Sequence, residues 1–249
     1  SGSLDAANAW DDLQDAAKQF VRHFDDGIDQ MGLVSFNLRA ETHFQLQQPF
    51  TSQAEYVIDT TNALGYTNTG EGLRHAYQQF QSGLERDRSA KVVVFFTDGR
   101  PTAFRGEIVG RDRIMAAYSN PYYVMGLWND PDDLPIHYRP PPDYCNVVTS
   151  CGGHDRNDVF DNARDTGYFW ANQIRSQDIL VYTIGLGDTS QPLGSILQPD
   201  QNYLRELANE NGITDSSQPK GKMYFAPSAA EIRTVFNLVA QDLLARLAH

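Results

Sequence analysis

Two apolar runs of strand length constrain this fold more than any other feature of the sequence. They are "KVVVFFT" at residues 91–97 and "DILVYTIGLG" at residues 178–187. A continuous apolar run of this length is typical of a strand that is buried on both faces of a parallel sheet, with helices on each side. The 249 residues suffice for one hydrophobic core with an insertion, so we expect a single domain over residues 1–249.

Helical periodicity surrounds these runs. Apolar residues recur at three- and four-residue intervals in residues 9–24, after "GYTNTG" at 65–70, and in the closing segment 232–247. Further helices are expected at 53–64 with Thr51 or Ser52 as the cap, at 158–176 and in a segment ending on Gly212, and further strands at 31–37, 43–47 and 222–227. This alternation predicts an α/β fold with a doubly wound, mostly parallel sheet and helices on both faces.

Residues 104–155 interrupt the alternation of strands and helices. They are rich in Pro, Tyr, Asp and Asn. A connection of this length inside a compact domain is usually functional or disordered, and its aromatic residues argue against disorder. We therefore expect an ordered insertion, in which Tyr122, Tyr123, Trp128 and Tyr138 form either a small local core or an exposed recognition patch.

The only two cysteines, Cys145 and Cys151, lie inside this insertion and are separated by five residues. Two cysteines with scattered histidines are too few for a zinc site. A local disulfide between them would favour a location outside the reducing cytosol. Two free thiols are the alternative, and the sequence leaves both open.

Charge and motif content exclude several classes of function. The 20 basic and 32 acidic residues give a formal net charge of −12, which opposes phosphate contacts and argues against a nucleic-acid partner. No stretch approaches the roughly 20 apolar residues that a membrane span requires. The sequence has no G-x-S-x-G, Walker A or HExxH motif. We therefore expect a binding function and no enzymatic activity.

The expected ligand site lies beyond the carboxyl ends of the strands, where open α/β sheets usually bind ligands. Ser1 and Ser3 of "SGS", Thr67 of "GYTNTG" and Asp98 of "TDG" all belong to loops at that end. Three hydroxyls and a carboxylate suit Mg²⁺, Mn²⁺ or Ca²⁺ better than zinc. The simpler alternatives are that Asp98 is a turn residue and that Thr67 or Thr69, with Thr69 favoured, caps the following helix.

These stretches resemble the von Willebrand factor A domain family. Its metal-ion-dependent adhesion site combines an Asp-x-Ser-x-Ser loop, a G-x-T-x-T-G type loop and a TDG type strand end, which "SGS", "GYTNTG" and "FFTDGRP" match in order. "MGLVSFN", "VYTIGLGD" and "YFAPSAAEIRTVF" resemble later segments of the family. The resemblance implies that Ser1 and Ser3 bind the cation directly, Thr67 directly or through water, and Asp98 through water. It also implies that an acidic side chain of a protein partner completes the coordination.

The resemblance places the family's first Asp two positions before Ser1, so the first central strand of the fold is missing from this sequence. Either the chain is a fragment that starts inside its metal loop, or residues 1–3 are a cloning linker that mimics this loop. In the family's strand order the absent strand lies between 31–37 and 91–97. We therefore expect a vacant slot about 10 Å wide between these two strands.

The leading functional hypothesis is a metal-dependent protein-binding module at the bacterial cell surface or in the cell envelope. The sequence most resembles bacterial domains of this family, including those of Tad-type pilus-assembly proteins. The alternative is an intracellular domain that assists an AAA+ ATPase or chelatase complex, which a disulfide would disfavour. A hydrolase that reuses the cation would need a nucleophile and a base, and the sequence identifies neither.

Overall fold

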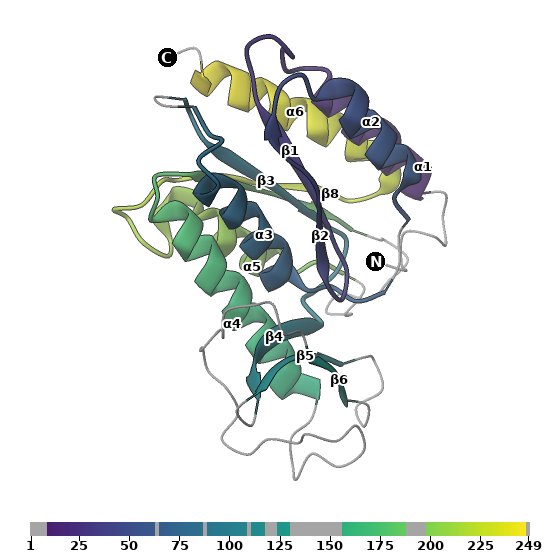
Figure 1. Ribbon diagram of the computed structural model, residues 1–249, viewed down its shortest axis with the longest axis vertical. Coiled ribbons are helices and arrows are strands. Elements are labelled where there is room, and N and C mark those ends of the chain that lie inside the picture. Colours follow the sequence, from purple (N-terminus) through teal and green to yellow (C-terminus); the bar gives the residue numbers. More distant parts are fainter. Residues whose placement is uncertain are drawn as a thin grey trace.

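A central sheet with helices on both faces forms the body of the protein (Figure 1). The computed structural model describes residues 9–62, 65–86, 89–108, 111–117, 124–129, 156–187 and 198–247. The helices are α1 (Ala9–Val21), α2 (Thr51–Thr60), α3 (Thr69–Gln81), α4 (Arg156–Arg175), α5 (Gln201–Ala208) and α6 (Ala229–Leu247). In Figure 1, α1, α2 and α6 cover one face, and α3, α4 and α5 cover the other. This arrangement confirms the predicted α/β class.

Three parallel strands make up one half of the central sheet. They are β3 (Val92–Thr97), β7 (Leu180–Leu186) and β8 (Met223–Ala226), with β7 in the middle. Tyr182 and Ile184 of β7 pack into one apolar cluster with α1 and α6. Val181 packs into a second cluster, with α3, α4 and α5. The strand is thus covered on both faces, as its apolar sequence predicts.

An antiparallel hairpin makes up the other half. Its strands are β1 (Met31–Phe36) and β2 (Ala40–Gln47). Among the described residues, β1 forms no ladder with β3, so a slot separates the two halves. The order across the molecule is therefore β2, β1, slot, β3, β7 and β8, which agrees with the strand order expected when the first strand is missing.

A small antiparallel sheet follows β3 directly. It consists of β4 (Ala103–Ile108), β5 (Arg111–Ala117) and β6 (Val124–Asn129), and it lies beside α4 (Figure 1). Phe104 and Ile114 are buried in it. The first part of the insertion is therefore regular secondary structure.

Several residues that the sequence analysis singles out lie outside the described residues: Ser1, Ser3, Tyr122, Tyr123, Tyr138, Cys145 and Cys151. The disulfide and the serine ligands therefore stay predictions. None of the helices within the described ranges has the length and apolarity needed to cross a membrane.

The predicted caps of α2 and α3 are wrong. The N-cap position of α2 is Phe50, and a remote carboxylate serves the helix: Asp26 Oδ1 accepts hydrogen bonds from the N–H groups of Phe50 and Thr51, each at 2.9 Å. At α3 the cap is Asn68, whose side chain accepts from the Glu71 N–H at 3.2 Å. Thr69 is the first helical residue.

Helix α5 ends four residues earlier than predicted. Asn209 adopts the left-handed conformation, with φ 53°, and its side-chain oxygen accepts from the N–H groups of Thr214 and Asp215 at 3.0 and 3.1 Å. These bonds hold the chain in a turn that ends the helix. Gly212, the predicted helix end, closes a short 3₁₀ turn instead.

Candidate functional site

The loop before α3 and the loop after β3 are joined by hydrogen bonds of the Thr67 backbone. The N–H of Thr67 donates to Thr102 Oγ1 at 2.9 Å, and its carbonyl accepts from the N–H groups of Thr102 and Ala103 at 2.9 and 3.3 Å. Asp98 begins the turn that leads to Thr102. Thr67 and Asp98 are each 6% exposed and line the same cavity. The two predicted ligands within the described residues therefore lie at one end of the sheet.

The "TDG" turn is stabilised by its own threonine. The Thr97 hydroxyl donates to the carbonyl of Gly99 at 3.1 Å and accepts from the N–H of Gly99 at 3.3 Å. These two bonds fix the backbone on either side of Asp98. A turn position and a ligand role are therefore compatible for Asp98 and need not be alternatives.

Asn68 connects the same loop to the end of β1. Its N–H donates to the carbonyl of Asn37 at 2.8 Å, and its side-chain amide donates to the carbonyl of Leu38 at 3.0 Å. Its side-chain oxygen also caps α3, and the residue is fully buried. This role of Asn68 was not predicted from the sequence. The signal was an Asn followed three residues later by Glu, a pattern typical of helix starts.

The local structure requires glycine at both glycine positions of "GYTNTG". Gly65 has φ +85°, a left-handed conformation that residues with a side chain rarely adopt. A Cβ on Gly70 would lie 2.5 Å from Cβ of Thr166, so glycine is what lets α3 approach α4 so closely. The motif therefore shapes the loop that carries Thr67.

A buried charged cluster lies behind the loops. Glu71 Oε1 accepts from Arg74 Nε at 2.8 Å, and Glu71 Oε2 accepts from Arg74 Nη2 at 3.1 Å and Arg105 Nη1 at 3.5 Å. The three side chains are 3%, 6% and 1% exposed, respectively. Arg105 belongs to β4, so this cluster fastens the insertion to the first turn of α3. Sequence reasoning missed it, because the Glu71–Arg105 pair is separated by 34 residues.

The donors at this end of the sheet fit a hard cation. Within the described residues, no group of three or more His, Cys, Asp and Glu side chains could hold a metal ion. Thr67 and Asp98 supply a hydroxyl and a carboxylate, the oxygen donors that Mg²⁺, Mn²⁺ and Ca²⁺ prefer. Two protein donors leave most positions of an octahedral ion open. A cation bound here would therefore need further oxygen ligands besides these two residues.

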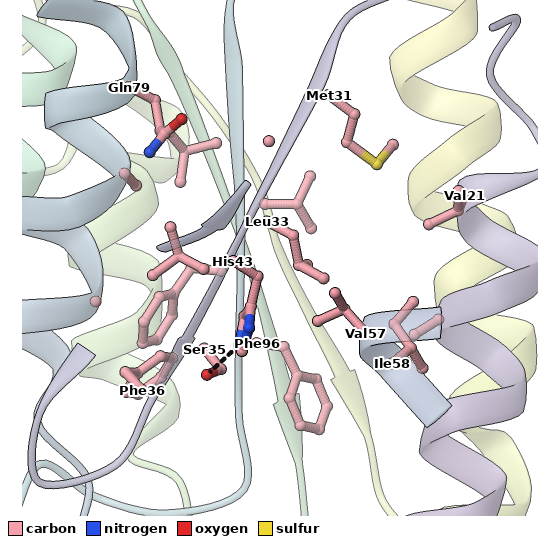
Figure 2. A pocket seen from close by; sticks show the side chains of 18 of the residues that line it. Val21, Met31, Leu33, Ser35, Phe36, His43, Val57, Ile58, Gln79 and Phe96 are labelled. Carbon is pink, nitrogen blue, oxygen red and sulfur yellow. Dashed lines mark hydrogen bonds between the residues drawn. The ribbon is translucent and has the colours of Figure 1, made fainter. Parts of the chain in front are cut away.

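A cavity of about 920 Å³ extends from these loops along the slot. Every residue of β1 and β3 lines it, together with side chains of α1, α2, α3 and α6. Figure 2 shows Met31 and Leu33 on the side of Val21, Val57 and Ile58, with Phe36 on the opposite side. The cavity is thus the slot itself, with apolar walls on both faces of the sheet.

The slot also corrects one expectation about β3. Val93 and Phe95 are buried, but Val92, Val94 and Phe96 are only partly buried. The prediction that this strand is buried on both faces is therefore wrong for one face, because the sheet position next to β3 is open.

Solved structures share this fold at low sequence identity. The chain aligns with the von Willebrand domain of the type V pili tip protein Mfa5 from Porphyromonas gingivalis with TM-score 0.64 and 16% identity, covering 99% of this chain and 93% of the other. The PilB minor pilin from Streptococcus sanguinis gives 0.64 and 17%, with coverage of 96% and 55%. The pilus adhesin SpaC from Lactobacillus rhamnosus GG gives 0.63 and 16%, with coverage of 99% and 30%.

At these identities the likeness establishes the fold alone. No curated protein sequence matches the chain. The sequence profile of the von Willebrand factor type A domain matches residues 1–132, which are 132 of the 249 residues. With more than half of its sequence matched, the chain belongs to the von Willebrand factor type A domain family.

Proposed function

We propose that this domain is a metal-ion-dependent protein-binding module of a pilus or another cell-surface assembly. Thr67, Asp98, Ser1 and Ser3 would hold Mg²⁺, with Mn²⁺ or Ca²⁺ as substitutes. An acidic side chain of a protein partner would complete the coordination. The observation that carries the proposal is the junction of the Thr67 and Asp98 loops, which brings a threonine and an aspartate that line the same cavity to one end of the sheet.

The donor chemistry explains why a partner would be needed. Hydroxyl ligands are neutral, so this donor set leaves part of the charge of a divalent cation uncompensated. A carboxylate that reaches the ion from outside supplies both the missing charge and an oxygen ligand. Binding of the partner would then require the cation.

The proposed location draws on the structural neighbours. The proteins compared above are a pilus tip protein, a minor pilin and a pilus adhesin. The fold shared with them supports an extracellular or envelope location for this domain. A disulfide between Cys145 and Cys151 would fit that location.

The insertion is the proposed source of partner specificity. We propose that residues 1–249 form one domain in which residues 104–155 border the site. Strand β4, which leads into this insertion, starts at Ala103, whose N–H donates to the Thr67 carbonyl at 3.3 Å. A partner carboxylate at the cation would therefore approach beside the start of β4.

Calorimetric titration with Mg²⁺ and Mn²⁺ tests the metal site. Asp98→Ala should weaken cation affinity at least tenfold, and Thr67→Ala several-fold, because each removes an oxygen donor. Asp161→Asn is the matched control, because it changes an exposed aspartate on α4 and should leave affinity unchanged. An immobilised acidic peptide should retain the wild type in Mg²⁺ and release it in EDTA. Cation affinity that neither site variant lowers would refute the proposal.

A further inference from the structure

A line of polar side chains joins the β1–β2 hairpin to α3. Thr42 Oγ1, on β2, lies 3.0 Å from Nδ1 of His75, on α3. The other ring nitrogen of His75, Nε2, lies 3.1 Å from Nη2 of Arg74. Both contacts are partly buried, so water competes with them less than it does at the surface. His75 therefore bridges the hairpin and a guanidinium.

The contact with Arg74 defines the protonation state of His75. A guanidinium has donors and no acceptor, so Nε2 of the ring accepts the hydrogen bond from Arg74 Nη2. Nε2 then carries no proton, and the neutral ring donates its Nδ1 proton to Thr42 Oγ1. Both nitrogens of a charged imidazolium are donors. His75 can therefore take up a second proton only by giving up the bond to Arg74.

Arg74 connects this histidine to the buried charged cluster behind the loops. Its Nε and Nη2 groups donate to Glu71, which also accepts from Arg105 of β4. Two guanidiniums and one carboxylate give these three side chains one net positive charge. A proton on His75 would add a further positive charge beside Arg74, and like charges disfavour the charged form of a titratable group.

Charged and titratable groups also lie on the elements that pack against α3: Glu41 and His43 on β2, Arg105 on β4 and Asp165 on α4. Strand β1, MGLVSF, contains no titratable side chain. His43 Nδ1 lies 3.8 Å from Glu41 Oε1, and His43 Nε2 contacts the Ser35 hydroxyl at 2.8 Å (Figure 2). These two groups of β2 therefore pair with each other, and Arg74 is the cation that opposes a proton on His75.

We propose that His75 is a pH-sensitive link, which holds the β1–β2 hairpin to α3 in neutral solution and releases it as the pH falls through the ordinary range of histidine. The neutral ring joins Thr42 to Arg74, whereas the protonated ring cannot accept from Arg74. The link is therefore complete above about pH 6.5, the ordinary pKa of histidine, and is lost progressively below it.

The hairpin also supports the loop that carries Thr67. The carbonyls of its turn residues Asn37 and Leu38 accept hydrogen bonds from Asn68 at 2.8 and 3.0 Å, and Thr67 is the residue before Asn68. A hairpin that is released from α3 in acid loses part of the support for these bonds. Acid would then weaken cation binding at Thr67. This consequence rests on the proposed metal site, whereas the link through His75 does not.

Amide exchange in EDTA tests the link without the metal site. If opening the hairpin frees a ring that the closed state cannot protonate, the opening equilibrium rises about tenfold between pH 7.5 and pH 5.5, because histidine has an ordinary pKa of about 6.5. Two amides report on this opening: the Leu46 N–H donates to Gln79 Oε1 of α3, and the Asn68 N–H donates to the Asn37 carbonyl. Their protection factors, corrected for the intrinsic pH dependence of exchange, should fall about tenfold over this pH range.

His75→Gln removes the titration, while its side-chain amide still offers an acceptor to Arg74 and a donor to Thr42. In this variant the two protection factors should change less than about twofold over the same pH range. His23→Gln is the matched control at an exposed histidine and should keep the wild-type response. A wild-type change below about twofold, or equal changes in the wild type and His75→Gln, would overturn the inference.

A second readout uses the wild type alone and so covers the case in which His75→Gln folds poorly. The ¹⁵N NMR shifts of the two ring nitrogens report which of them carries a proton. At pH 7.5 His75 should be neutral with its proton on Nδ1, because Nε2 accepts from Arg74. A proton on Nε2 at this pH would overturn the inference.

Mg²⁺ titration at both pH values tests the consequence for the metal site. Carboxylates ordinarily ionise near pH 4, so they stay charged at pH 5.5. Wild-type affinity should fall at least threefold from pH 7.5 to pH 5.5, and the affinity of His75→Gln should stay within about twofold. Equal wild-type affinities would overturn the coupling of His75 to the site. Absence of Mg²⁺ binding at both pH values would refute the proposed function, and amide exchange in EDTA would still decide the link.

Discussion

Strands β3 and β7 are neighbours with similar apolar sequences and different surroundings. Strand β7 has a ladder on each edge, and its residues Val181, Tyr182 and Ile184 are completely buried. Strand β3 has a ladder on one edge among the described residues, and Val94 and Phe96 are only partly buried. An apolar run thus predicts that a strand forms, but its neighbours decide how much of it is buried.

Polar contacts join the two halves of the sheet where a ladder is absent. At the carboxyl end of the slot, Asn68 bonds to the Asn37 carbonyl and Thr67 bonds to Thr102. The Glu71 cluster then fixes α3 to β4. Between β1 and β3, directional polar bonds at this end and the stacked rings of Phe36 and Phe95 replace a ladder, whereas β7 has a ladder along each of its edges.

The largest expected effect comes from removing the charge at that end. Glu71→Gln should lower the free energy of unfolding by about 3–5 kcal/mol, because the buried guanidiniums of Arg74 and Arg105 lose the carboxylate that contacts both. Urea unfolding measures this loss. The control Glu41→Gln changes a side chain that is 74% exposed and should cost less than about 0.5 kcal/mol. Equal losses would show that the polar cluster does not stabilise the junction of α3 and β4.

A matched pair of valines compares the two halves directly. Val181→Ala in β7 should cost about 2 kcal/mol, because the side chain is completely buried and its removal leaves a cavity. Val94→Ala in β3 should cost less than about 1 kcal/mol, since Val94 already lines the slot. Urea unfolding of both variants measures the difference. Equal losses in the two variants would contradict the comparison.

Much of this fold could be predicted from the sequence because periodicity is a local signal. Helices α1 and α6 and strand β7 follow directly from the spacing of their apolar residues. Within the site, the positions of Thr67 and Asp98 followed from the order of the elements, since loops at the carboxyl ends of parallel strands share one edge. Both residues line the same cavity.

The contacts that the sequence could not provide are those between distant residues. The Glu71–Arg105 pair and the Asp26 cap of α2 each join segments more than 20 residues apart. Thr51 looked like a cap because it precedes an apolar helix, but its hydroxyl donates to Asp26 instead. The strands of the insertion were missed because its composition suggests irregular structure more strongly than its short alternating segments suggest strands.

The smallest expected effect tests the Asp26 cap of α2, which lies in the half of the molecule that contains β1 and β2. The N–H of Phe50, followed by the N–H and hydroxyl of Thr51, lowers the pKa of Asp26 below its ordinary value. A folded-state pKa below the unfolded value of about 3.9 means that ionised Asp26 stabilises the fold above that pH. This contribution is lost as the pH falls through the lowered pKa.

Asp26→Asn keeps a side-chain oxygen acceptor but removes the charge. Its thermal midpoint should therefore lie about 2–4 °C below that of the wild type above pH 5, which is the effect expected for one helix cap in a domain of this size. The gap should shrink as the pH falls below about 4, because the wild-type carboxylate then becomes protonated. Asp178→Asn, at an exposed aspartate beyond α4, should show no such pH dependence. A difference in thermal midpoint that stays constant from pH 6 to pH 3 would mean that the charge of Asp26 contributes nothing. The start of α2 would then be held by packing alone.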